Sequence, residues 1–441
     1  MSSILLRHAT ILTMNDARDV VAGDVSIRDG RIAAVGRVPD APHDVVLDVD
    51  GGIVLPGFVQ THIHLCQTLF RGYADDLALM EWLRRRVWPM EAAHRPSSLR
   101  AAARLAAAEL LRTGTTALLT METVHDTDAV FEAIADTGLR ATIGKCMMDA
   151  DRQVPARLLE PMRASIDESL ALQRRWAGAR NGRLRAAFAP RFAVSCSRDL
   201  LEAVAALSAQ GDVLVHTHAS ESRDEMILVR QQSGGLGNIE YFAAIGLASP
   251  RLCAAHCVWV DEREQQLLAD HEVKVLHCPG SNLKLGSGIA PVPELRAHGV
   301  CVSLGADGAA CNNHLDMFDE MRLAATIQAV RQRPGALPAR EVVWMATREG
   351  ARTLGLDGEV GSIEAGKRAD VIVVDTRAPH LAPGPDPYST LVYAARGTDV
   401  RHTIVDGDLV VRDAQLVHLD AFEIAATARA EAASLATRAG L

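Results

Sequence analysis

The sequence predicts an α/β protein in which a (β/α)8 TIM barrel is joined to a small β-sandwich domain formed by both chain ends. Strand-like pieces separated by turns occur at both ends of the chain. Between them, eight short apolar runs alternate with stretches rich in Ala, Leu, Glu and Arg, as expected of βα units. With 441 residues, 48% of them hydrophobic, the chain can build one large and one smaller core.

The two ends of the chain share a hairpin-like pattern. The N-terminal pieces are "ILLRHATILTM", "DVSIRDGRIAAVG" and "VVLDVDGGIVLPG". The pattern returns in "EVGSIEAGKRADVIVVD" and "HTIVDGDLVVRDAQLV", around the Pro-rich connector "APHLAPGPDP", and an Ala-rich helix follows. We therefore predict that residues 1–56 and 358–441 form one composite β-sandwich domain with a C-terminal helix.

The central region, residues 57–357, is predicted to be the catalytic barrel. The expected strands are "GFVQTHIH", "TTALLT", "RATIGKCMM", "LRAAFAPRF", "VLVHTHAS", "RLCAAHCV", "VKVLHCP" and "CVSLGADG". In such a barrel the carboxyl ends of the strands converge on one face, where active sites form. Functional residues are therefore expected at the ends of these runs.

Four side chains at predicted strand ends are candidate metal ligands. His62 and His64 end the first run and, being two residues apart, face the same side of a strand. His218 comes from the fifth run and Asp307 from the eighth. A lone His-x-His pair is a weak signal, but four converging groups predict one divalent metal ion per chain. Three imidazoles and a carboxylate suit Zn²⁺, with Fe²⁺ as the alternative.

Motifs along nearly the whole chain resemble the amidohydrolase superfamily, in its mononuclear aminohydrolase branch. They are "DGRIAAVG", "PGFVQTHIH", "HTHASE", "AAHC", "CPGSNLKLGSGIAPVPEL", "SLGADGAACNNHLDMFDEMRLA" and "GSIEAGKRADVIVVD". The pattern is most similar to deaminases of S-adenosylhomocysteine, methylthioadenosine and 5'-deoxyadenosine. The resemblance implies that the four candidate ligands bind the metal, that Glu221 shuttles protons and that His256 holds the attacking hydroxide. A two-metal branch with a carbamylated lysine, here Lys145, is disfavoured because its members lack a carboxylate matching Glu221.

The chemistry of deamination requires these roles independently. Replacing an exocyclic amine on an aromatic azine needs an activated water, a proton for a ring nitrogen and a proton for the departing ammonia. Glu221 lies three residues past His218, where a turn can bring its carboxyl group beside the water. Asp307 can take the proton of that water and return it to the leaving ammonia, and His256 can stabilise the intermediate. We expect a hydrolytic deaminase of a small aminated N-heterocycle.

The resemblance leaves the substrate open between two classes. Trp82 and Glu91 match residues that line the nucleoside pocket of adenosine-type deaminases, although Trp82 packing into the core is an equal alternative. Gln67 and Arg191 match residues that bind the oxo-purine edge in guanine deaminases, and a guanidinium suits such acceptors. We expect an adenosine-type nucleoside, with a guanine- or pterin-type deaminase or a triazine amino- or chlorohydrolase as alternatives. A barrel that binds a ligand without turnover is disfavoured by Glu221.

Composition limits the partners. The formal net charge is −9 and no basic stripe is present, so neither nucleic acid nor an anionic membrane surface is expected. No apolar run approaches the ~20 residues of a membrane span, and the N-terminus does not read as a signal peptide. Eight cysteines without a CxxC pair indicate reduced thiols. We expect a cytoplasmic homo-oligomer that takes a small heterocyclic substrate and water.

Overall fold

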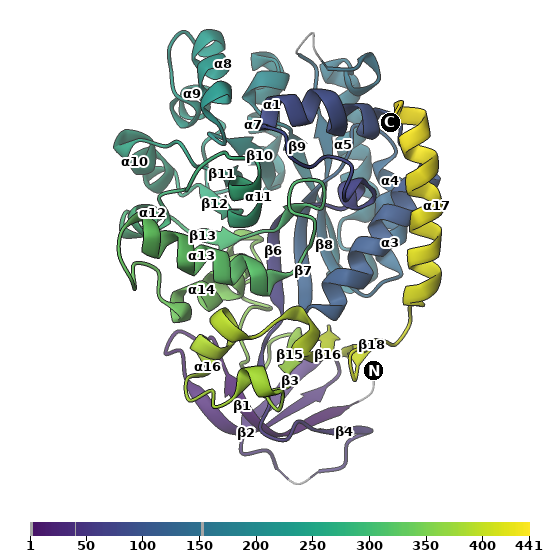
Figure 1. The fold of residues 1–441 in the computed structure, drawn as a ribbon, viewed down its shortest axis with the longest axis vertical. Coiled ribbons are helices and arrows are strands. Elements are labelled where there is room, and N and C mark those ends of the chain that lie inside the picture. The colour runs from purple at the N-terminus through teal and green to yellow at the C-terminus, as the bar shows by residue number, and fades with distance from the viewer. Residues whose placement is uncertain (1–2, 40, 151–153) are drawn as a thin grey trace.

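The computed structural model describes residues 3–39, 41–150 and 154–441, which form two sheets (Figure 1). A parallel sheet surrounded by helices makes up the larger part, and a mixed sheet built from both chain ends lies beside it. The predicted fold class is therefore confirmed. The domain boundaries at 1–56, 57–357 and 358–441 stay a prediction, and residues 1–2, 40 and 151–153 within them lie outside the described part.

Each of the eight predicted barrel runs contains a strand. They are β6 (Phe58–His64), β7 (Thr115–Met121), β8 (Arg140–Met147), β9 (Leu184–Pro190), β10 (Val215–Ala219), β11 (Leu252–His256), β12 (Lys274–His277), β13 (Val302–Leu304) and β14 (Asp307–Gly308). The eighth run is split into β13 and β14. Because β13 pairs with β12 and β14 pairs with β6, the sheet returns to its first strand.

The break in the eighth strand contains a glycine that sterics require. A Cβ atom on Gly305 would lie 2.5 Å from the carbonyl oxygen of His62, so only glycine fits this approach of the last strand to the first. After the break, Asp307 takes a left-handed backbone conformation with φ of 61°, and His256 does the same with φ of 73°. Such conformations are uncommon for residues other than glycine and gather at functional sites.

Helices follow the barrel strands and pack around them. The longer ones are α3 (Pro96–Arg112), α4 (Thr127–Ala135), α5 (Met162–Trp176), α7 (Arg198–Gly211), α8 (Arg223–Ser233), α9 (Asn238–Ala244), α10 (Glu262–Asp270), α13 (Met317–Arg331) and α14 (Ala339–Ala346). Shorter ones are η1 (Leu65–Phe70), α1 (Leu79–Trp82), η2 (Leu83–Val87), α2 (Trp88–Ala92), η3 (Ala156–Leu158), α6 (Ala179–Gly182), η4 (Ala193–Ser195), α11 (Pro279–Lys284), α12 (Val292–Ala297) and α15 (Arg348–Thr353). The longer helices bury apolar residues, as α7 does with Leu200, Leu201 and Val204.

The second sheet joins the two ends of the chain. Its strands are β1 (Ile4–Leu12), β2 (Val20–Arg28), β3 (Arg31–Gly36), β4 (Val45–Asp48), β5 (Ile53–Pro56), β15 (Val371–Val374), β16 (Val400–Val405), β17 (Asp408–Arg412) and β18 (Gln415–Leu416). The connection carries η5 (Pro379–Leu381), α16 (Pro387–Ser389), η6 (Thr390–Ala394) and η7 (Gly397–Asp399). The antiparallel pairing of β5 with β15 brings the two ends together.

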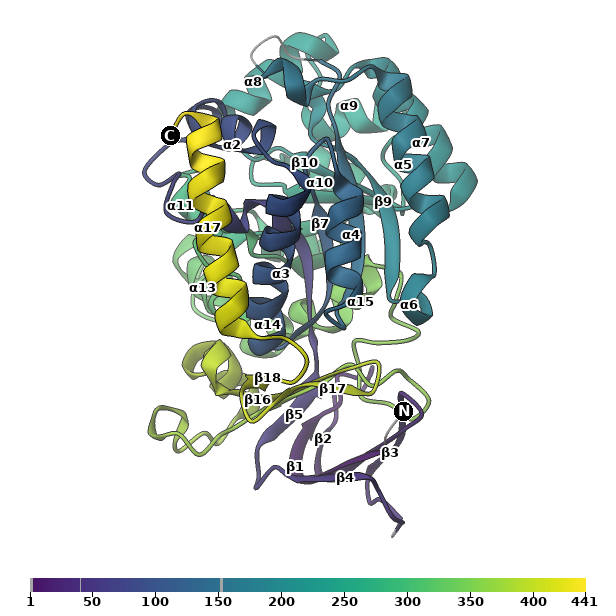
Figure 2. The same ribbon diagram turned by 90° about the vertical axis from the view of Figure 1, so that its right-hand side faces the viewer.

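The C-terminal helix α17 (Ala421–Ala439) lies along α3 of the barrel (Figure 2). Asp420 caps its N-terminus, because the Asp420 Oδ1 atom accepts hydrogen bonds from the Phe422 and Glu423 amides. Near the end of the helix, Arg438 Nε donates to the Ala93 carbonyl at 3.0 Å. The sequence pattern groups this helix with the small sheet, whereas its packing partner is the barrel. None of the helices in the described ranges is both long and apolar enough to cross a membrane.

Candidate active site

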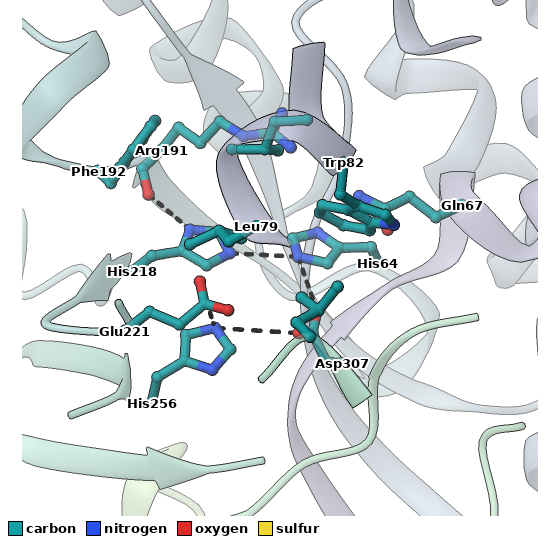
Figure 3. A pocket seen from close by; sticks show the side chains of 12 residues that line it. His64, Gln67, Leu79, Trp82, Arg191, Phe192, His218, Glu221, His256 and Asp307 are labelled. Carbon is teal, nitrogen blue, oxygen red and sulfur yellow. Dashed lines mark hydrogen bonds and ion pairs between the residues drawn. The ribbon is translucent and has the colours of Figure 1, made fainter. Parts of the chain in front are cut away.

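The four predicted metal ligands meet at the carboxyl ends of the barrel strands. Asp307 Oδ1 lies 3.4 Å from His62 Nε2 and 3.2 Å from His64 Nε2. The Nε2 atoms of His64 and His218 are 3.3 Å apart (Figure 3). The structure therefore brings together the Nε2 atoms of three imidazoles and one carboxylate oxygen.

The Nδ1 atom of each of these histidines is engaged, so its Nε2 is the atom left to bind a cation. His64 Nδ1 donates to the Met121 carbonyl at 2.8 Å, and His218 Nδ1 donates to the Arg191 carbonyl at 2.6 Å. His62 Nδ1 lies 2.6 Å from His216 Nε2, and its own Nε2 is buried without a hydrogen-bond partner in the described chain. Such contacts fix the tautomer of a metal-binding histidine. The donor set therefore fits a divalent metal.

The protonation states of His62, His218 and Asp307 also suit metal binding. Burial lowers the pKa of His62 to about 4, and it lowers the pKa of His218 well below the ordinary value. Burial alone would raise the pKa of Asp307, but His62 and His64 outweigh it and hold that pKa well below its usual range. Neutral imidazoles and an ionised carboxylate are the forms that coordinate metals.

Glu221 and His256 lie beside the histidine cluster. His256 Nε2 is 3.6 Å from Glu221 Oε2 and 3.9 Å from Asp307 Oδ2. Burial raises the pKa of Glu221 to about 7. Ser222, not Glu221, caps α8, and the Arg223 guanidinium packs over an indole ring rather than on Glu221. A buried carboxyl group with a pKa near neutrality, free of these structural roles, can hold or release a proton at physiological pH.

Three of the predicted substrate-binding residues form one buried network. Arg191 Nη1 and Nη2 donate to the two carboxylate oxygens of Glu91 at 2.5 and 3.2 Å. Gln67 Nε2 donates to Glu91 Oε1 at 3.0 Å. Burial alone would lower the pKa of Arg191, but Glu91 outweighs it and raises that pKa. Residues that the sequence pattern assigns to two different substrate classes thus form hydrogen bonds with one another.

A cavity opens above the histidine cluster. Its walls are His64, Gln67, Leu79, Trp82, Leu83, Arg191, Phe192, His218, Glu221, His256, Leu285 and Asp307. Trp82 therefore lines the cavity while also being largely buried, whereas Glu91 is buried, contacts Arg191 and Gln67, and is not among the lining residues. Direct substrate contact by Gln67, Trp82, Glu91 and Arg191 stays a prediction.

Lys145, the candidate for a bridging carbamate, has other partners. Its ammonium forms ion pairs with Glu160 and with Glu168 and lies 3.4 Å from Ser165 Oγ. Glu168 and Ser165 belong to α5. In the described part of the chain no hydrogen bond or ion pair joins Lys145 to the histidine cluster, which disfavours the two-metal alternative.

The sequence pattern assigned no role to three polar residues that contact the predicted catalytic groups. Ser281, Asn282 and Ser287 belong to α11 and the turn after it, in the motif "CPGSNLKLGSG". Their side chains contact Asp307, His256 and Glu221, respectively. The available signal was their place directly after the seventh barrel strand, where a βα loop reaches the active face.

Comparisons with known proteins agree with this geometry. Residues 53–410 match the Amidohydrolase family. The chain is 42% identical to a 5'-deoxyadenosine deaminase of Methanothermobacter thermautotrophicus, covering 98% of this chain and 99% of that one. It is 38% identical to a 5-methylthioadenosine/S-adenosylhomocysteine deaminase of Pelotomaculum thermopropionicum, over 99% of this chain and 100% of that one. Among solved structures, an adenosine deaminase from Xanthomonas campestris with bound zinc superposes with a TM-score of 0.92, at 32% identity and 98% coverage of both chains.

Proposed function

Because this chain belongs to the amidohydrolase family, we propose that it is a metal-dependent hydrolytic deaminase of adenosine-type nucleosides. The observation that carries the proposal is the convergence, in one cavity, of a histidine and aspartate cluster with a buried carboxyl group and a further histidine. A binding protein needs no buried proton carrier at this place, whereas hydrolysis of a C–N bond does.

His62, His64, His218 and Asp307 would hold the divalent metal. When bound there, such an ion lowers the pKa of a coordinated water, so that the water can ionise near neutral pH. The zinc in the structure of the Xanthomonas relative supports Zn²⁺ rather than Fe²⁺ for this chain. We also propose a cytoplasmic homo-oligomer, as the composition suggests.

The protein's own groups would then manage the protons. Glu221, with its pKa of about 7, would deliver a proton to the ring nitrogen as the amine-bearing carbon is attacked. The Nε2 atom of His256 faces the space between Glu221 and Asp307, where it would orient the attacking oxygen. Asp307 would receive the proton of the water and pass it to the departing ammonia.

The pocket favours an adenosine-type ligand over an oxo-purine. Both terminal nitrogens of Arg191 already donate to Glu91, so fewer of its five N–H groups are left to read an oxo-purine edge. The Oε1 atom of Gln67 is buried and has no hydrogen-bond partner within the described chain, so this corner offers an acceptor. An acceptor suits the hydroxyl or amine donors of a nucleoside. The named activities of the full-length relatives point the same way.

A parallel assay of ammonia release tests the proposal. Purified protein with about one zinc per chain should deaminate 5'-deoxyadenosine, methylthioadenosine and S-adenosylhomocysteine, and it should leave guanine, pterins and aminotriazines unchanged. Removing the metal with a chelator should abolish turnover, and adding zinc should restore it. Turnover of guanine alone would show that the substrate is an oxo-purine. Full activity in metal-free protein would refute the proposed metal dependence.

A further inference from the structure

One short segment after the seventh barrel strand contacts three separate catalytic groups. Ser281 Oγ donates to Asp307 Oδ2 at 2.6 Å, and Asn282 Oδ1 lies 2.8 Å from His256 Nδ1. Ser287 Oγ donates to Glu221 Oε1 at 3.2 Å. The three side chains are at most 4% exposed, so water does not replace these contacts.

Hydrogen bonds to the backbone of this segment hold it in place. The Gly280 amide donates to Glu320 Oε2 at 3.0 Å, and a Cβ atom on Gly280 would lie 2.5 Å from the other oxygen of that carboxylate. The chain then turns back, because the Ser287 amide donates to the Asn282 carbonyl at 2.9 Å. The Ser287 carbonyl accepts from Trp259 Nε1 at 2.8 Å. This anchoring brings residues six positions apart to the same cavity wall.

Each contact occupies one atom of a catalytic group and leaves another facing the site. Ser281 binds Oδ2 of Asp307, while Oδ1 of the same carboxylate accepts from the Gly308 amide at 2.7 Å and faces His62 and His64. Ser287 binds Oε1 of Glu221, while Oε2 points toward His256.

Asn282 acts on His256 in the same way. Its amide oxygen is an acceptor, so it selects the His256 form that carries a proton on Nδ1 and turns Nε2 toward Glu221. The three contacts thus fix orientations that the reaction needs but that the catalytic residues do not set themselves.

We propose that Ser281, Asn282 and Ser287 are positioning residues that orient Asp307, His256 and Glu221. This inference rests on the proposed function for its effect on turnover, but its effect on metal affinity does not depend on which substrate is used. The partners of metal ligands and catalytic groups typically contribute about 10- to 100-fold in affinity or activity.

Kinetics of the zinc-loaded protein provide the first test. Ser281→Ala, Asn282→Ala and Ser287→Ala should each lower kcat about 10- to 100-fold with little change in KM, because the cavity wall keeps its shape. Ser287→Thr keeps the hydroxyl and should recover most of the lost rate. The matched control is Ser169→Ala, a buried serine of α5 whose hydroxyl, among the described residues, bonds only to the Ser165 carbonyl. Rates within about twofold of this control would overturn the proposal.

Zinc affinity provides a second test that needs no substrate. In competition with a chelator, Ser281→Ala should bind zinc about 10- to 100-fold more weakly than Ser169→Ala, because Asp307 loses the side-chain donor on Oδ2 and keeps only the Gly308 amide on Oδ1. Asn282→Ala and Ser287→Ala should bind zinc normally, since neither side chain touches a proposed ligand. If the unaltered protein deaminates no nucleoside, the proposed function fails while this comparison still decides the inference. Equal zinc affinity of Ser281→Ala and the control would overturn the role of Ser281. If Ser281→Ala does not fold, the rates of the other two variants decide the proposal.

Discussion

The chemistry of single residues in this protein depends on which atom their neighbours leave free. The Nδ1 atoms of His64 and His218 donate to main-chain carbonyls, and Nδ1 of His62 contacts another imidazole. Nε2 is therefore the atom available for a metal in all three. The sequence identifies these histidines but not their tautomers. A contact of 2.6 to 2.8 Å therefore leaves Nε2 as the atom with which each of these proposed ligands would bind a metal.

Glu221 is the residue whose replacement separates catalysis from metal binding. Glu221→Gln keeps the size of the side chain and removes the proton that a group with a pKa of about 7 exchanges. We expect kcat to fall about 10²- to 10⁴-fold, or about 3–5 kcal/mol in the barrier, with unchanged zinc content. Parallel measurement of kcat and zinc content checks this, and near-normal turnover at full zinc would refute the proton shuttle.

His94 makes stability depend on pH outside the metal cluster. Burial lowers its pKa from 6.5 to about 3, while its Nδ1 lies 2.9 Å from Ser98 Oγ and its Nε2 lies 3.1 Å from the Cys66 carbonyl. Below pH 6.5 His94 is protonated in the unfolded chain but stays neutral in the folded chain. The contribution of neutral His94 to the free energy of unfolding is therefore complete above pH 6.5 and is lost as pH falls toward 3. From pH 7.5 to pH 5 the loss should be about 2 kcal/mol.

His94→Gln removes this titration while keeping an amide that can form one hydrogen bond. Urea unfolding of both proteins at pH 7.5 and pH 5 should show their difference in free energy of unfolding narrowing by about 2 kcal/mol at the lower pH. Groups common to both proteins cancel in this comparison. Parallel pH dependences would show that His94 is protonated in the folded state as well.

At the scale of elements, the broken eighth strand sets the geometry of the metal cluster. Gly305→Ala would place a methyl group 2.5 Å from the carbonyl oxygen and 2.6 Å from the amide nitrogen of His62. Neither backbone atom can yield without moving β6, so His62 and Asp307 should separate. We expect the zinc content to fall and the protein to lose about 1–3 kcal/mol of stability, as for other overpacked sites.

Metal analysis and thermal unfolding check this prediction. The matched control is Gly358→Ala, where a Cβ atom would meet nothing within 4 Å. That variant should keep its zinc and change its Tm little. If Gly305→Ala also bound zinc normally, the approach of the two strands would not be what holds the cluster together.

At the scale of the whole molecule, a buried ion pair joins the two sheets. Arg140 begins β8 and donates through Nε and Nη2 to the carboxylate of Asp370, which precedes β15, at 2.9 and 3.0 Å. The same carboxylate accepts from the Asp406 amide at 2.8 Å. All three residues are buried, so the contact lies between the barrel and the sheet of the chain ends.

Arg140→Met should lower the free energy of unfolding by about 3–5 kcal/mol, because it leaves the buried Asp370 carboxylate without its cation. Urea unfolding measures the loss. Arg368→Met is the comparison, since Arg368 also pairs with Asp406 but its side chain is 17% exposed. Its cost should be clearly smaller. A loss of less than about 1 kcal/mol for Arg140→Met would show that apolar packing alone joins the sheets.

The sequence by itself determined the order of strands and helices and the set of candidate ligands. Apolar runs separated by helical stretches indicate βα units, and the convergence of strand ends in such a barrel brings His62, His218 and Asp307 to one face before any coordinates are known. The order of elements follows from local patterns, and the set of candidate ligands follows from one rule of barrel topology. Both can therefore be predicted from the sequence.

Only the tertiary structure decided the contacts between loops. The pairing of Arg191 with Glu91 spans 100 residues, and the contact of Ser287 with Glu221 spans 66. No periodicity encodes such contacts, because they depend on how far each loop turns back over the barrel. The packing of α17 on α3 was hidden for the same reason: an amphipathic helix shows that it buries one face but not which surface covers it.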